Sequence, residues 1–240
     1  MKKLTVLIIF FLVIQLIQAD DTEDPIWKKA GIIAKENSNL VPGELRQIAR
    51  QTNKKGKVKS EESLLIRYEK IGEQVEAIYV SGERDGETMP EDDERVQSVL
   101  NENVLDNSSL FNNFQGNDLK VTKTSEFREI KGYNCLAFNY EFNKIDEEDN
   151  KISVTGKVWL EEENGIPLLN EAILESSKKV VKDMKVISHY HYGEDGWYMN
   201  EVYTSFRISL ILMSIYIEMD RFYQNYWEYE PINSETSLSD

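Results

Sequence analysis

A pattern of apolar residues at helical spacing begins after residue 23. They follow Asp24-Pro25, which supplies an N-cap acid and then a proline at the first helical position. The stripe consists of Ile26, Trp27, Ala30, Ile33 and Ala34. Residues three and four apart share one side of a helix, so the pattern predicts a short amphipathic helix that ends near Asn37-Ser38.

Beyond this helix the apolar positions alternate with polar ones, which is typical of half-buried strands. Leu40 to Thr52 and Val58 to Tyr68 are predicted strands on either side of the turn Lys54-Lys55-Gly56-Lys57. Gln74 to Ser81 is predicted to follow as the next strand, and Asp85-Gly86 has the chemistry of a hairpin turn. The first part of the chain is therefore expected to form consecutive hairpins.

The alternation stops between Pro90 and Asn103. Three acids, Asp92, Asp93 and Glu94, precede apolar residues at helical spacing, and acids stabilise the N-terminus of a helix. The apolar residues are Val96, Val99 and Leu100. We predict a second short helix here.

Strands resume at residue 119 and continue almost to the end. The predicted segments are Leu119 to Phe127, Tyr133 to Phe142, Ile152 to Glu161, Ile166 to Glu175, Val181 to Tyr192 and Trp197 to Ile208. Ile208 to Ile217 is too short to span a bilayer, and its β-branched residues favour strand over helix. That interpretation requires a turn between Ser209 and Ser214.

About ten hairpin strands with only two helices predict a mainly β (α+β) fold. An antiparallel sheet of this size curls, and the helices can cover its apolar side. We expect a curled antiparallel sheet forming an unclosed half-barrel, with two short helices covering the concave side. The half-barrel domain is expected over residues 20–229, followed by an acidic disordered tail over 230–240.

The first 19 residues have the features of a secretory signal peptide. Two lysines precede the apolar run Leu4 to Ile17, and Ala19 is the small residue before an acidic stretch. We predict cleavage after Ala19 and a periplasmic mature protein; the alternative is an uncleaved anchor, although the run is shorter than the roughly 20 residues of a spanning helix.

Composition removes several classes of function. The formal net charge of −15 leaves no field to attract nucleic acid, so no nucleic-acid partner is expected. The single cysteine, Cys135, cannot form an internal disulfide, and its place in a strand-like segment indicates a small buried residue rather than a nucleophile.

Turns and strand starts carry a resemblance to a known family. The segments are Leu40-Val41-Pro42-Gly43, Gly132-Tyr133-Asn134-Cys135, and the hairpin from Gly156 to Leu168 through Asn164-Gly165. With the N-terminal helix they resemble the LolA/LolB-like family of periplasmic carriers that sort outer-membrane lipoproteins. The resemblance implies an eleven-stranded unclosed barrel with a helical lid, an apolar cavity for acyl chains and no enzymatic activity.

Carriers of this family use an arginine inside the barrel to govern closed and open states. None of the arginines considered, Arg46, Arg67, Arg84, Arg128 and Arg207, aligns with that role from the sequence, so no functional residue is transferred.

Aromatic and apolar residues on the predicted strands are the candidate cavity lining. They are Trp27, Tyr68, Leu136, Phe138, Tyr140, Phe142, Val158, Tyr190 and Phe206. Ordinary core packing is the alternative for the same residues. A curled sheet can leave part of such a surface facing a cavity, and apolar cavities bind apolar guests.

Motifs for catalysis or cofactor binding are absent from the sequence. There is no Gly-x-Ser-x-Gly elbow and no glycine-rich phosphate loop, so we expect no catalytic residue and no cofactor. His189 and His191 share one face of a strand, but no further ligands lie nearby in sequence, and a metal site is not expected. The lysines at 54, 55, 57 and 59 cluster at a hairpin tip that could touch anionic lipid or remain in solvent.

Three hypotheses follow. The first is a periplasmic carrier or chaperone that binds lipid or the acyl chains of lipoproteins. The second is an envelope protein–protein interaction or sensing module with a filled β-sheet core. The third is a metal-assisted or carboxylate-based hydrolase, whose paired carboxylates would come from positions distant in the sequence.

Overall fold

The computed structural model describes residues 24–102, 119–145, 151–176, 181–209 and 214–229. The predicted signal peptide over residues 1–19 and the predicted tail over residues 230–240 lie outside this part of the chain.

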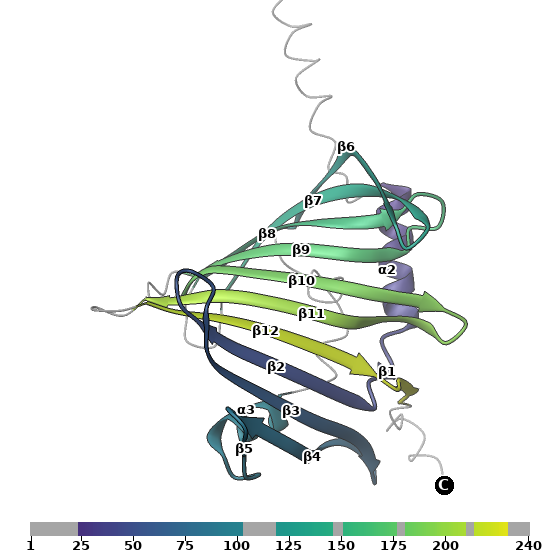
Figure 1. Ribbon diagram of the computed structural model, residues 1–240. Coiled ribbons are helices and arrows are strands. Elements are labelled where there is room, and N and C mark those ends of the chain that lie inside the picture. The colour runs from purple at the N-terminus through teal and green to yellow at the C-terminus, as the bar shows by residue number, and fades with distance from the viewer. Residues whose placement is uncertain (1–23, 103–118, 146–150, 177–180, 210–213, 230–240) are drawn as a thin grey trace, which may run out of the picture.

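Eleven antiparallel strands form one large sheet that does not close on itself (Figure 1). Its order is β5-β4-β3-β2-β12-β11-β10-β9-β8-β7-β6, so neighbours are consecutive hairpins except where β2 pairs with β12. The predicted fold class is confirmed. The strand bounds are β2 Glu44–Thr52, β3 Val58–Ile71, β4 Gln74–Arg84, β5 Glu87–Thr88, β6 Lys120–Ile130, β7 Tyr133–Ile145, β8 Lys151–Glu161, β9 Pro167–Ser176, β10 Val181–Gly193, β11 Gly196–Ser209 and β12 Ser214–Gln224.

The strand predicted over Leu40 to Thr52 is wrong as a single element. Leu40–Val41 forms β1, which pairs with β13 (Trp227–Glu228) in a separate two-stranded sheet, and β2 begins only at Glu44. Pro42 has no backbone N–H to continue a ladder, and Gly43 donates its N–H to the carbonyls of Gln224 and Asn225. The chain therefore changes partner at this point.

The described residues at both ends of the ambiguous apolar segment near the C-terminus are strand, as predicted. β11 ends at Ser209 and β12 begins at Ser214, with Ile208 paired to Ile215. The expected turn between them lies outside the described residues.

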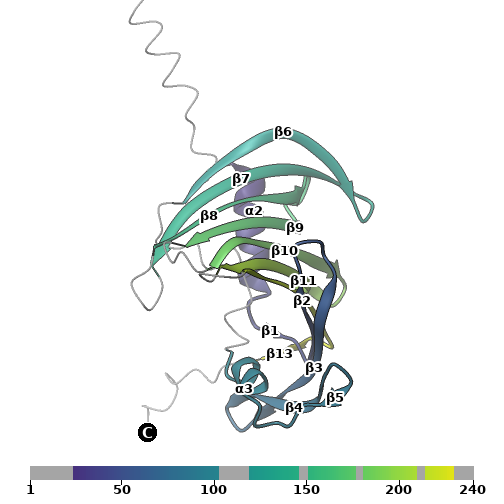
Figure 2. The same ribbon diagram turned by 60° about the vertical axis from the view of Figure 1, so that its left-hand side comes forward.

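Both predicted helices lie on the concave side of the sheet (Figure 2). Helix α2 (Pro25–Glu36) begins at Asp24, whose side chain accepts a hydrogen bond from the Ile26 N–H. Helix α3 (Glu94–Leu100) begins at Asp93, whose side chain accepts from the Arg95 N–H. Asn37, at the end of α2, accepts a hydrogen bond from the Trp197 N–H on β11 and so joins the helix to the sheet.

Each helix covers its own apolar core. The α2 core contains the buried residues Trp27, Ala30, Ala34, Phe138, Tyr140, Val158, Leu160, Leu168, Tyr190 and Trp197, among others. The α3 core contains Val41, Leu45, Leu64, Ile66, Tyr68, Met89, Val96, Val99 and Tyr223. The two cores occupy different halves of one continuous sheet.

Candidate functional site

The central strands β11 and β12 carry a line of apolar side chains on the concave face. Their register pairs Met219 with Thr204, Ile217 with Phe206 and Ile215 with Ile208. Directly paired residues, and residues two apart on a strand, point to the same face of a sheet. We call Phe206, Ile208, Ile215, Ile217 and Met219 the central apolar strip; all five are half-buried.

The strip lies outside the core that α2 covers. In Figure 1, α2 lies near the right-hand ends of β8 to β10. The strip comes from the C-terminal part of β11 and the N-terminal part of β12. A hollow of about 360 Å³ touches the strip at Phe206 and Ile217, and its other lining residues lie in the β2–β3 turn or on the strands' other face, including Tyr203 and Arg207. The strip is half-buried rather than enclosed.

The structure places the predicted cavity residues in two settings. Most lie in solid core: Trp27, Phe138, Tyr140, Phe142, Val158 and Tyr190 in the α2 core, with Leu136 half-buried against it, and Tyr68 in the α3 core. Phe206 alone among the nine lies on the central apolar strip. Their role as a ligand lining stays a prediction.

Packing under α2 is dense. The Trp27 and Phe138 ring centroids lie 5.8 Å apart, and the Tyr190 and Trp197 rings stack at 4.8 Å. The Tyr140 hydroxyl donates to Asn170 Oδ1 at 2.8 Å, which satisfies both polar groups inside the core. Burial raises the pKa of the Tyr140 and Tyr190 hydroxyls.

Arg221 projects from β12 onto the concave face, directly beyond the strip. Its two terminal nitrogens each donate to one oxygen of Glu102 at 2.7 Å, and its Nε donates to Gln47 Oε1 at 2.8 Å. Only 15% of the Arg221 side chain and 35% of the Glu102 side chain are exposed. Burial by itself would lower the pKa of Arg221, but hydrogen bonds and charge from Glu102 and Tyr223 together outweigh burial, and the pKa is raised.

Sequence reasoning missed Arg221, because the arginines considered for the inside of the barrel did not include it. The signal was present: Ile215, Ile217, Met219 and Arg221 are spaced two apart, so one strand places all four on one face. Glu102 gave no such signal, because its position opposite Arg221 depends on how α3 packs on the sheet.

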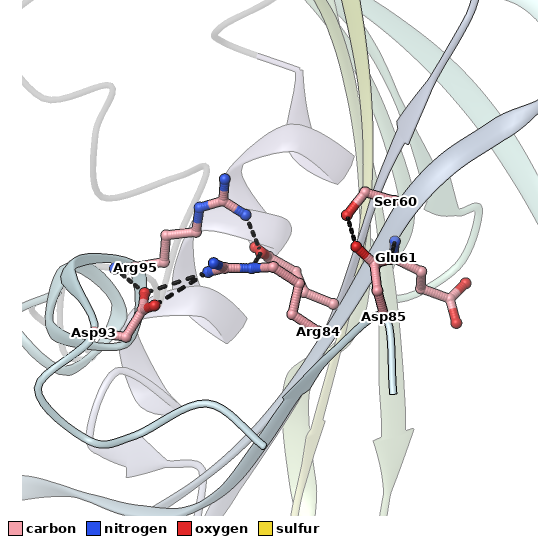
Figure 3. Close-up of polar contacts among 7 residues, drawn as sticks. Ser60, Glu61, Arg84, Asp85, Asp93 and Arg95 are labelled. Carbon is pink, nitrogen blue, oxygen red and sulfur yellow. Dashed lines mark hydrogen bonds and ion pairs between the residues drawn. The ribbon is translucent and has the colours of Figure 1, made fainter. Parts of the chain in front are cut away.

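Ion pairs also fix the other end of α3. Arg84 on β4 donates to both carboxylate oxygens of Asp93 at 3.3 Å, as Figure 3 shows, and its Nε donates to Glu62 at 3.3 Å. Arg95 on α3 also contacts Glu62. Hydrogen bonding from the Arg95 N–H and the charges of both arginines lower the pKa of Asp93. Beside this network, the Asp85 carboxylate accepts from Ser60 and from the Glu61 N–H.

Cys135 and the histidines occupy structural positions. Cys135 is fully buried, as predicted, and burial raises the pKa of its thiol to about 11, which disfavours the thiolate. His191 lies 3.1 Å from Asp195 and stacks on Tyr198, whose ring stacks on Tyr226. Within the described ranges, no cluster of three or more histidine, cysteine or acidic residues could hold a metal ion. The lysines at the β2–β3 hairpin tip are exposed.

Among the described residues, no helix has the length and apolar character needed to cross a bilayer.

The fold and the strip together define an unclosed half-barrel with a partly apolar concave surface. No protein-family model and no curated protein matches the chain. Two solved structures show a weak likeness. One, described as the complex structure of Pseudomonas aeruginosa MucA/MucB, has 9% identity and a TM-score of 0.24 and covers 88% of this chain and 100% of that chain.

The second structure is described as MucB in complex with MucA(peri). It has 8% identity and a TM-score of 0.21, and it covers 85% of this chain and 98% of that chain. Likeness at this level carries no conclusion about ligand or partner. Membership of the LolA/LolB-like family therefore stays a prediction, and function must be inferred from the geometry of this chain.

Proposed function

We propose that this protein is an exported, periplasmic binding protein, without enzymatic activity, that shields an acyl chain of a lipid or lipoprotein in its half-barrel. The observation that carries the proposal is the central apolar strip. Five apolar side chains lie in line on the concave face and remain half-buried, although both neighbouring cores are tightly packed.

Burial of the strip would supply the driving force. Covering about 200 Å² of apolar surface contributes about 5 kcal/mol at roughly 25 cal/mol per Å². The ends of the sheet, β5 and β6, do not meet, so a guest can reach the concave face without unfolding the sheet. An acyl chain is the apolar guest whose narrow shape fits a line of side chains two residues apart.

A second candidate function has its own observation. The half-barrel under α2 is filled by Trp27, Phe138 and Tyr190, which are at most 7% exposed. Filled packing is what an envelope interaction or sensing module would show, because such a module binds its partner on the outside. We propose this function if the strip takes no guest.

A direct measurement of acyl-chain binding distinguishes the carrier from the interaction module. The purified protein is titrated with a fluorescent acyl probe, and an organic extract of the protein is analysed for lipid. Ile217→Glu places a charge on the strip and should weaken probe binding by tenfold or more, since an unpaired charge against an acyl chain is costly. Absence of extracted lipid together with no probe binding by the wild type would rule out the carrier.

Ile173→Glu is the matched control. Ile173 lies on β9 in register with Thr155 and Lys185, on the face opposite the Tyr140–Asn170 pair, and is 49% exposed. The same change of side chain there should leave probe binding unchanged. Equal loss in both variants would show that the probe binds outside the strip.

A further inference from the structure

The concave face places a buried cation at the end of the central apolar strip. Arg221, Met219, Ile217 and Ile215 follow one another on the same face of β12, and Phe206 and Ile208 lie beside them on β11. A strand advances about 3.4 Å per residue, so Arg221 and Ile215 are about 20 Å apart along the strand. This row of β12 side chains is therefore charged at one end and apolar along the rest.

This length matches a common amphiphile. Carbon–carbon bonds of about 1.5 Å make an extended chain advance about 1.25 Å per carbon, so about 16 carbons cover the distance from Arg221 to Ile215. A head group at one end of such a chain would then lie at Arg221.

The present partner of Arg221 shows which head group fits. Glu102 meets the guanidinium with both oxygens at 2.7 Å, in the paired geometry that planar carboxylates adopt with arginine. Gln47 accepts from Nε and the Tyr223 side chain also hydrogen-bonds Arg221, so the positions that Glu102 holds on the terminal nitrogens are the ones available for exchange. Glu102 follows α3 at Asn101 and is the more exposed partner, so it can leave at lower cost than Arg221.

We propose that Arg221 is the head-group anchor for a long-chain carboxylate, such as a free fatty acid, and that Glu102 is an internal carboxylate that occupies this anchor until the ligand displaces it. The proposal rests on the acyl-binding function and adds the ligand class to it. Only one carboxylate at a time can bridge both terminal nitrogens, so a ligand that takes this paired geometry displaces Glu102.

Paired ligands test the head group. Palmitate, methyl palmitate and hexadecyl phosphate are titrated separately below their aggregation concentrations, by displacement of the acyl probe. We expect the wild type to bind palmitate about tenfold more tightly than methyl palmitate, because only palmitate has a charge for Arg221. Tighter binding of hexadecyl phosphate than of palmitate would overturn the carboxylate assignment.

Variants test whether the ligand carboxylate replaces Glu102 at Arg221. Glu102→Gln removes the competing charge and should increase palmitate affinity severalfold while leaving methyl palmitate affinity unchanged. The double variant Arg221→Gln/Glu102→Gln leaves no unpaired buried charge and should bind both ligands equally. Its unfolding midpoint in urea shows whether it is folded, and Glu102→Gln with Arg221 intact provides an independent test.

The control lies on the same strand. Asp220 faces the other side of the sheet and pairs with Arg50 at 2.6 Å, so Asp220→Asn also takes a carboxylate partner from an arginine, while Arg50 keeps its pair with Glu61 at 2.7 Å. It should leave palmitate affinity unchanged. If the wild type binds palmitate and methyl palmitate equally, the head-group proposal fails while the acyl-binding function stands; if neither binds, the acyl-binding function fails.

Discussion

Gly156 leaves the space on the concave face that the Tyr140 ring occupies. The two residues are paired across β7 and β8, and a Cβ at Gly156 would overlap the ring carbons and hydroxyl of Tyr140. That hydroxyl bonds Asn170, so a small residue at position 156 makes a buried polar contact possible on β9. The sequence contains this glycine, but only the strand register shows its purpose.

Gly156→Ala should destabilise the protein by about 2 kcal/mol, since it displaces a packed ring and breaks a buried hydrogen bond. Gly31→Ala is the control: Gly31 lies inside α2 with open space where a Cβ would be, and alanine there should stabilise by up to about 1 kcal/mol. Urea unfolding measures both. Equal stability of Gly156→Ala and the wild type would contradict the packing described for Tyr140.

At the scale of elements, the stability of α3 comes from its contacts with the sheet and not from the helix alone. A helix of 7 residues is too short to be stable alone, and it is held by Val96 and Val99 on one face and by ion pairs at both ends. Its existence followed from the sequence through the acids at its start and the apolar spacing. Its anchors, Arg84 and Arg221, come from distant strands and could not be assigned from sequence.

The lowered pKa of Asp93 makes the stability of the protein depend on pH. An unfolded aspartate has a pKa of about 3.9, so the stabilisation from Asp93 is complete above that value and is lost as pH falls through the lower folded pKa. The wild type should therefore melt at a higher temperature than Asp93→Asn at pH 7, and the two should converge near pH 2. Thermal unfolding followed by circular dichroism measures this.

Asp92→Asn serves as the control, because Asp92 is exposed and does not cap α3. It should melt at the wild-type temperature at both pH values. A difference between wild type and Asp93→Asn that persists at pH 2 would show that the carboxylate charge is not the cause.

For the whole molecule, one continuous sheet connects the two cores, each of which is covered by its own helix. β12 and β2 are distant in sequence but paired over nine residues, from Tyr216↔Thr52 to Gln224↔Glu44. This pairing makes one sheet from the two ends of the chain. We expect the α2 core and the α3 core to unfold together.

Leu160→Ala and Leu64→Ala test this cooperativity. Both side chains are at most 2% exposed, one in each core, and each truncation should cost about 2–5 kcal/mol. Urea unfolding followed by tryptophan fluorescence and by circular dichroism should give one shared transition in both variants. Two separate transitions, with Leu64→Ala moving only one of them, would show that the cores are independent.

The sequence by itself determined the elements: both helices, the succession of hairpins, the strands at Ile208–Ser209 and Ser214–Ile217, and the burial of Cys135. These features depend on local periodicity and turn chemistry, which can be recognised from residues that are close together in the sequence. Tertiary structure decided the break at Pro42-Gly43, the filling of the space under α2 by most of the predicted lining residues, and the meeting of Arg221 with Glu102. Those outcomes depend on which distant segments share the concave face. A sequence pattern with a period of two assigns a residue to one face of a strand, but it does not specify which distant residue that side chain contacts.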